Sequence, residues 1–211
     1  LFHMRIMYIS RLDPKSNRAH VYNTLMTCAA VSKIDSHQVT LVTAGSTPPH
    51  EKHISRTSVV VPGGSQKVVC IGYLWNIKLY HAGGLRSKMS VIIQNLQLCA
   101  YITKRRRKYD VLYFRDPLLF IPPLWAKFLL AKPVYFEIHA ELKKPISQAF
   151  NNVLASIATG NITITHALEE YYRKRSTHIT TIYCAASEPE QFERVVSSVG
   201  TLREDLPLPQ Q

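Results

Sequence analysis

The stretch PVYFEIHAE, residues 133–141, decides the fold class. Its first half is a short, continuously apolar run, which is typical of a strand buried on both faces of a parallel sheet. Its second half places Glu137, His139 and Glu141 where that strand ends. The stretch therefore predicts a piece of sheet core and, directly after it, a group of polar side chains at one edge of the sheet.

Strands and helices alternate on both sides of this stretch. The pattern predicts strands over residues 5–10, 38–44, 57–62, 110–114, 133–138, 161–165 and 178–184, and helices over 20–33, 85–102, 117–131, 146–158 and 167–175. Asp116 before Pro117 is typical of a capped helix start. We therefore expect an α/β fold, with a doubly wound, mainly parallel, Rossmann-like sheet and helices on both faces.

The composition is that of a globular protein with a strong positive charge. The 211 residues carry 26 Lys and Arg against 14 Asp and Glu, a formal net charge of +12, which favours an anionic partner. Cys28, Cys70, Cys99 and Cys184 form no C-x-x-C pair, so we expect reduced core thiols and no metal site. The longest apolar run is shorter than the about 18 residues that a spanning helix needs, and we expect a cytoplasmic protein.

The two ends of the chain differ from its middle. Residues 1–4, LFHM, resemble a cloning remnant, with Met4 as the natural start. Residues 4–192 carry the alternating pattern, and residues 193–211, which include LREDLPLPQQ, read as a linker between domains. We therefore expect one lobe, followed by a second lobe that the 211 residues do not include.

Polar residues at the carboxyl ends of the strands are the candidate site, because open α/β sheets bind ligands there. These residues are Lys15, Ser16, Asn17, His20, Arg115, Asp116, Glu137, His139, Glu141, Thr165 and His166. A histidine at such a place either serves a ligand or donates to a structural acceptor, and both roles remain open. The sequence has no glycine fingerprint for a dinucleotide, no phosphate loop, no D-x-D pair and no G-x-S-x-G elbow.

The run KRRRK comprises Lys104, Arg105, Arg106, Arg107 and Lys108 and ends a predicted helix. Such a run is either a solvated helix end or a site for acidic lipid headgroups, to which each cation contributes on the order of 1 kcal/mol. Tyr73, Trp75 and Tyr80 could add aromatic contacts at a membrane interface. Nucleic acid is less favoured, because the interleaved aromatic and basic residues of a binding module do not accompany the run.

The order of the motifs adds a resemblance to a known family. The segments MRIMYIS, SNRAHVYNTLMTCAAVSK, HQVTLVTA, YDVLYFRDPL, KPVYFEIHAE, NITITHALEEYY and TIYCAASEPEQF resemble, in this order, the N-terminal half of a retaining GT-B glycosyltransferase of family 4. Enzymes of bacterial O-antigen and capsule synthesis, among them α-N-acetylgalactosaminyltransferases, are the most similar. The resemblance implies the acceptor-side lobe of a two-lobe enzyme that uses a UDP-sugar, held mainly by the other lobe, and needs no metal.

The resemblance also implies partners and residue roles. The acceptor would be a polyprenyl-diphosphate-linked glycan of lipopolysaccharide synthesis, and the enzyme would lie on the inner face of the cytoplasmic membrane. His139 matches the family histidine that contacts the transferred sugar, and Glu137 would hold its other ring nitrogen. Near the start of the chain, Lys15, Ser16 and Asn17 stand in place of the family's Gly-Gly pair, and His20 matches the histidine at its helix start. Further along, Arg115 and Asp116 match its Arg-Asp turn, and Thr165 and His166 match its loop after the sixth strand.

One family motif is missing from the sequence. The motif E-x7-E of the second lobe needs two glutamates eight positions apart, and no two glutamates of this chain have that spacing. We therefore expect the 211 residues alone to transfer no sugar. Two other classes remain open: a non-catalytic Rossmann-like domain that binds an anionic membrane surface or nucleic acid, and a small hydrolase or epimerase.

Overall fold

A computed structural model describes residues 3–11, 19–33, 37–43, 67–70, 84–142, 144–176 and 178–182 of the chain. Within these residues seven strands form one sheet, in the order β3-β2-β1-β4-β5-β6-β7, and every neighbouring pair is parallel. The strands are β1 (Arg5–Ser10), β2 (Gln38–Thr43), β3 (Lys67–Cys70), β4 (Val111–Phe114), β5 (Val134–Ile138), β6 (Gly160–Thr163) and β7 (Ile179–Thr181). The predicted parallel α/β sheet is confirmed.

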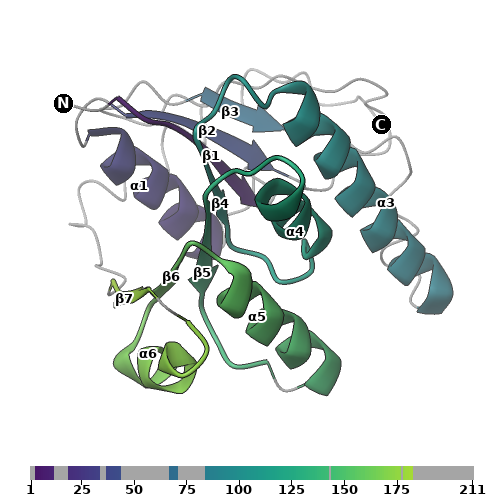
Figure 1. Cartoon of the computed structure of the whole chain (residues 1–211), viewed down its shortest axis with the longest axis vertical. Helices are drawn as coiled ribbons and strands as arrows, with labels where there is room; N and C mark the ends of the chain where they lie inside the picture. The colour runs from purple at the N-terminus through teal and green to yellow at the C-terminus, as the bar shows by residue number, and fades with distance from the viewer. Residues whose placement is uncertain are drawn as a thin grey trace, which may run out of the picture.

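Helices cover both faces of the sheet (Figure 1). They are α1 (Ala19–Lys33), α3 (Gly84–Lys104), α4 (Ile121–Phe128), α5 (Pro145–Ile157) and α6 (His166–Arg173). Crossovers between parallel strands are right-handed. A crossover helix that leads toward β3 therefore packs on one face of the sheet, and one that leads toward β7 packs on the other. Accordingly α1 lies on one face, and α3, α4 and α5 lie on the other (Figure 1).

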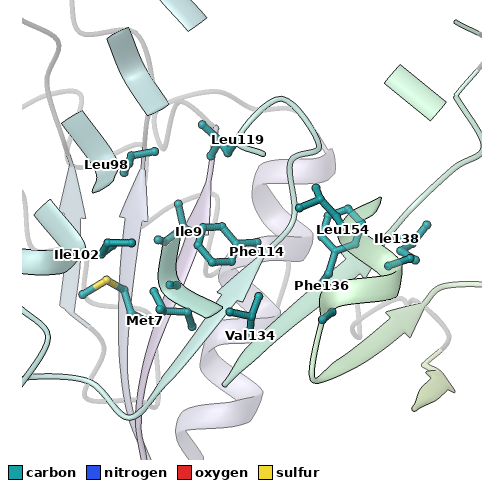
Figure 2. Close-up of a cluster of buried hydrophobic side chains, with 14 of the residues drawn as sticks. Met7, Ile9, Leu98, Ile102, Phe114, Leu119, Val134, Phe136, Ile138 and Leu154 are labelled. Carbon is teal, nitrogen blue, oxygen red and sulfur yellow. The ribbon is translucent and has the colours of Figure 1, made fainter. Parts of the chain in front are cut away.

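The core has two layers that follow the alternation of side chains along each strand. In β1, Met7 and Ile9 pack with residues of α3 to α6, whereas Tyr8 packs with α1. Figure 2 shows the larger layer, in which Phe114 and Phe136 from the central strands meet Leu98 of α3 and Leu154 of α5. A carboxylate on β5, Glu137, therefore points into the smaller layer, beneath α1.

The predicted start of α4 is wrong. The sequence suggested a helix over 117–131, capped by Asp116, but α4 spans Ile121–Phe128, with proline in its first turn. Proline fits there because the first helical residues need no backbone N–H donor. The Asp116 carboxylate instead accepts from the Leu118 N–H at 2.9 Å and closes a turn ahead of the helix.

Other predicted elements agree with the structure or lie outside it. The predicted strand over 57–62 lies outside the described residues, and the sequence reading missed β3. The tail after residue 182 also lies outside them. Cys28 and Cys99 are free and buried, as expected, while the side chains of Cys70 and Cys184 are not described. No helix in the described part is long and apolar enough to cross a membrane.

The two edges of the sheet have different polar contacts. At the amino edge, where the strands begin, Arg5 donates to both carboxylate oxygens of Asp110, at 2.6 and 3.0 Å. This pair lowers the pKa of Asp110 to about 2. The carboxyl edge, where the strands end, carries most of the candidate residues named from the sequence.

Candidate functional site

The candidate site is a polar cluster at the carboxyl ends of β4 and β5, beneath the first turns of α1. Its members are Tyr8 from β1, Arg115 directly after β4, Glu137 at the end of β5, and His139 directly after β5. The pairing of Phe114 with Phe136 sets the register that brings Arg115 beside Glu137. Three strands that are far apart in the sequence thus contribute to one cluster.

Glu137 is the centre of this cluster and is only 6% exposed. Its Oε2 accepts a hydrogen bond from the Tyr8 hydroxyl at 2.6 Å. Its Oε1 contacts His139 Nε2 and lies 4.0 Å from Arg115 Nε. A buried carboxylate is tolerated only with such partners, and here both oxygens have them.

These partners decide the ionisation of Glu137. Burial by itself raises the Glu137 pKa, but the hydrogen bond from His139, the charge of Arg115 and the hydrogen bond from Tyr8 outweigh it, so that the pKa lies below the usual 4.5. The Tyr8 pKa is raised well above 10.0, chiefly by burial and then by the charge of Glu137. The cluster therefore holds an ionised carboxylate and a protonated phenol at neutral pH.

Arg115 connects the cluster to α1. Its Nη1 donates to the backbone oxygen of His20 at 3.2 Å and also to the Thr24 hydroxyl. The Thr24 hydroxyl in turn donates to the same backbone oxygen at 2.9 Å. Since the Arg115 side chain is only 11% exposed, its guanidinium serves the packing of α1 on the sheet as well as the charge balance of Glu137.

His139 is the member of the cluster that reaches the surface, with its side chain 25% exposed. Because an ionised carboxylate only accepts hydrogen bonds, Nε2 must carry the proton that faces Glu137. Nδ1 lies 3.4 Å from Arg115 Nη2, a group that only donates, so a neutral ring with a bare Nδ1 fits both neighbours. Both ring nitrogens of His139 thus face a partner, and these two contacts fix the orientation of the ring where it reaches the surface.

A second polar contact lies beside this cluster. Asp116 follows Arg115 and lies 3.7 Å from Arg11 Nε, which joins the end of β4 to the end of β1. Burial raises the Asp116 pKa, and the charge of Arg11 and the hydrogen bond from Leu118 only partly offset this. The two residues after β4 therefore differ: Arg115 turns toward α1, and Asp116 closes the turn that precedes α4.

The other sequence candidates do not join the cluster. Thr165 is the N-cap of α6, where its hydroxyl accepts from the Leu168 N–H at 3.3 Å. His166 is exposed and lies 3.3 Å from a carboxylate oxygen of Glu169, and Glu141 is exposed beyond the end of β5. Lys15, Ser16 and Asn17 lie outside the described residues, and His20 contributes its backbone oxygen to Arg115.

Sequence reasoning missed Tyr8, a member of the cluster, and Thr24, which contacts Arg115 from α1. Tyr8 lies inside an apolar strand and is stacked on Tyr113, with ring centroids 4.5 Å apart, so it resembles ordinary core. Thr24 lies in the middle of a helix. Alternation along β1 was the one available signal, since it places Tyr8 on the opposite face from Met7 and Ile9.

The basic run lies away from this cluster. Lys104 ends α3, and residues 105–108 form the turn that leads into β4, so the run belongs to the amino edge of the sheet. Tyr73, Trp75 and Tyr80 lie outside the described residues. Among the described residues, no group of three or more His, Cys, Asp or Glu could hold a metal ion.

Comparisons with known proteins identify the fold. No protein-family model and no curated protein matches the chain. Sucrose-phosphate synthase from Thermosynechococcus elongatus matches with a TM-score of 0.58 and 13% identity over 88% of this chain and 49% of that one. HepE from Anabaena, in complex with UDP and glucose, matches with a TM-score of 0.55 and 12% identity over 94% and 50%. The chain has the fold of one GT-B lobe.

Not every protein with this lobe transfers sugars. UDP-N-acetylglucosamine 2-epimerase from Rickettsia bellii matches with a TM-score of 0.53 and 12% identity, over 98% of this chain and 50% of that one. The chain thus spans about half the length of each of these three proteins. At these identities the GT-B lobe is a likeness of fold alone.

Proposed function

We propose that the chain is the acceptor-side lobe of a nucleotide-sugar-dependent glycosyltransferase. The observation that carries the proposal is the partly exposed imidazole of His139, fixed by Glu137 and Arg115 at the edge of the sheet where α/β folds bind ligands. The likeness of the lobe to HepE, which was solved with UDP and glucose, supports a UDP-sugar as the donor. The second lobe would hold most of that donor.

The finer assignment follows the family resemblance. The sugar would be N-acetylgalactosamine, the acceptor a polyprenyl-diphosphate-linked glycan of O-antigen synthesis, and the location the inner face of the cytoplasmic membrane. Transfer would retain the anomeric configuration by front-face substitution, in which the leaving diphosphate helps to deprotonate the acceptor hydroxyl. His139 would stabilise charge that develops on the sugar, an effect that depends on a fixed orientation of the imidazole.

Substitution of His139 in the complete enzyme tests this role. We expect His139→Ala to lower kcat at least tenfold while the dissociation constant for UDP changes little, because the nucleotide is held mainly by the other lobe. His178→Ala is the matched control, since His178 is exposed next to β7 at the amino edge. Equal losses of turnover and nucleotide affinity would contradict the assigned role.

An assay of the reaction products separates transfer from epimerisation. The epimerase likeness gives a second reaction class for a lobe of this shape. A transferase forms a glycosylated acceptor together with UDP, whereas an epimerase changes the nucleotide sugar without any acceptor. Conversion of UDP-N-acetylglucosamine in the absence of acceptor would favour the epimerase and remove the transferase proposal.

A further inference from the structure

A corner of the amino edge combines exposed apolar side chains with the basic run. Both α3 and α4 run from the carboxyl edge back to the amino edge, because each one connects parallel strands. Their C-terminal ends therefore meet. We call the surface formed there the α3–α4 corner; it consists of Trp125, Phe128 and Leu129 together with residues 104–108.

The three apolar residues share one face at the C-terminal end of α4, where Leu129 is the C-cap, because positions i, i+3 and i+4 are neighbours on a helix surface. Trp125 is 37% exposed, Phe128 is 68% exposed and Leu129 is 64% exposed. Side chains of this size are usually buried, and a group of them on one exposed face marks an interaction surface. Within the described part of the chain, α3 covers part of Trp125, while Phe128 and Leu129 stay mostly exposed.

Hydrogen bonds place the basic run directly beside the apolar face. The Trp125 indole N–H donates to the Thr103 hydroxyl at 2.9 Å, one residue before the run begins. Lys132 Nζ donates to the Tyr109 backbone oxygen at 3.1 Å, one residue after the run ends. The C-terminal end of α4 and the segment after it are thus tied to both ends of residues 104–108.

The run itself is held in place while most of its cations face solvent. Arg5 Nη1 donates to the Arg107 backbone oxygen at 2.7 Å, and the Lys108 N–H donates to the Arg105 backbone oxygen at 2.8 Å. Arg105 packs over the Tyr101 ring, with its guanidinium carbon 4.2 Å from the ring centroid. The side chains of Arg106, Arg107 and Lys108 are exposed.

We propose that the α3–α4 corner docks on an acidic phospholipid bilayer. Its cations complement anionic headgroups, and its indole, phenyl and isobutyl groups suit the boundary between headgroups and acyl chains. A nucleic acid would use the cations but would leave Phe128 and Leu129 without an apolar partner. The proposal deepens the proposed function, since an enzyme that acts on lipid-linked acceptors works at a membrane, but vesicle binding can be measured without any transfer reaction.

Vesicle flotation of the 211-residue chain tests the docking. We expect binding to vesicles of phosphatidylcholine with phosphatidylglycerol, weaker binding to phosphatidylcholine alone, and loss of binding as salt screens the charges. Replacing Arg106, Arg107 and Lys108 by Gln should weaken binding roughly a hundredfold. The matched control replaces the exposed residues Arg173, Lys174 and Arg175 by Gln, with the same change in net charge, and should leave binding within a few-fold of the wild type.

A second pair of variants tests the apolar half of the corner. Phe128→Ser with Leu129→Ser should weaken vesicle binding at least tenfold, whereas Ile146→Ser with Val153→Ser, exposed apolar positions on α5, should not. In a Trp75→Phe background Trp125 is the only tryptophan, because the chain has two, and its fluorescence should shift to the blue on vesicles.

Three results would overturn the docking proposal. They are equal binding to neutral and acidic vesicles, binding that survives the change at 106–108, and binding of an oligonucleotide that depends on 106–108 while vesicles are not bound. None of these results bears on transfer by the complete enzyme. Conversely, equal losses of turnover and nucleotide affinity in the His139 test would contradict the proposed function and leave the docking result unchanged.

Discussion

The Tyr8 hydroxyl donates a hydrogen bond of 2.6 Å to Oε2 of the buried Glu137 carboxylate. We expect Tyr8→Phe to lower the free energy of unfolding by about 2 kcal/mol, because a hydrogen bond to a charged, buried group is lost while the ring and its stacking on Tyr113 are kept. Urea unfolding followed by circular dichroism measures the change. Tyr135→Phe, the same chemical change on the same strand as Glu137, is the control and should cost much less; equal losses would remove the special role of Tyr8.

The lowered pKa of Glu137 makes part of the stability depend on pH. The ionised form is favoured more in the folded than in the unfolded state, so its contribution is complete above the unfolded pKa near 4.5 and is lost as the pH falls through the folded pKa. Glu137→Gln should therefore be less stable than the wild type at pH 7, and the difference should shrink below about pH 4.5. Urea unfolding of both proteins from pH 7 to pH 3 measures it, and a difference that grows on acidification would contradict the assignment.

At the scale of elements, Asn95 on α3 fixes the start of α4. The side chain is fully buried; its Nδ2 donates to the backbone oxygens of Leu118, at 3.0 Å, and Val91, at 2.8 Å, and its Oδ1 accepts from the Ile121 N–H at 3.0 Å. Asn95→Leu leaves these groups without their partner and should lower the free energy of unfolding by about 3 kcal/mol.

Hydrogen exchange locates this effect. The Ile121 amide should exchange much faster in Asn95→Leu than in the wild type, because its acceptor is gone. Leu96→Ala, at a position that is 57% exposed, is the control and should change neither the stability nor the exchange by much. Unchanged protection of Ile121 in the Asn95 variant would show that another group fixes the start of α4.

The elements that could be predicted from the sequence are those with a local signal. Strand β5 is a continuous apolar run, and alternation along it places Glu137 and His139 on the same side, so their contact could be foreseen. The start of α4 could not be foreseen, because Asn95, which fixes it, acts from 26 residues away. Tyr8 reaches Glu137 across 129 residues, and nothing in the sequence around Tyr8 indicates its partner.

At the scale of the whole molecule, two observations lead to one expectation about activity. The sequence has no E-x7-E motif, and the chain matches only part of the known proteins. The chain spans about half of the proteins whose fold it shares. We expect the purified 211-residue chain to fold and to transfer no sugar from UDP-N-acetylgalactosamine, because under the proposed function most of the donor would be bound by a second lobe outside these residues. Release of UDP in the presence of a lipid-linked acceptor measures this, and turnover above a heat-denatured control would contradict it.

The candidate site and the α3–α4 corner lie at opposite edges of the sheet, and the distance between these edges bears on the size of the acceptor. Strand β1 runs from the amino edge to the carboxyl edge over 6 residues, a length of about 20 Å at the usual rise per residue. With the α3–α4 corner on a bilayer and the strands normal to it, the imidazole of His139 would stand about that far above the headgroups. Under the proposed docking and the proposed function, a lipid-anchored substrate would have to bridge this height, so the lobe should favour long oligosaccharides over lipids that carry a single sugar.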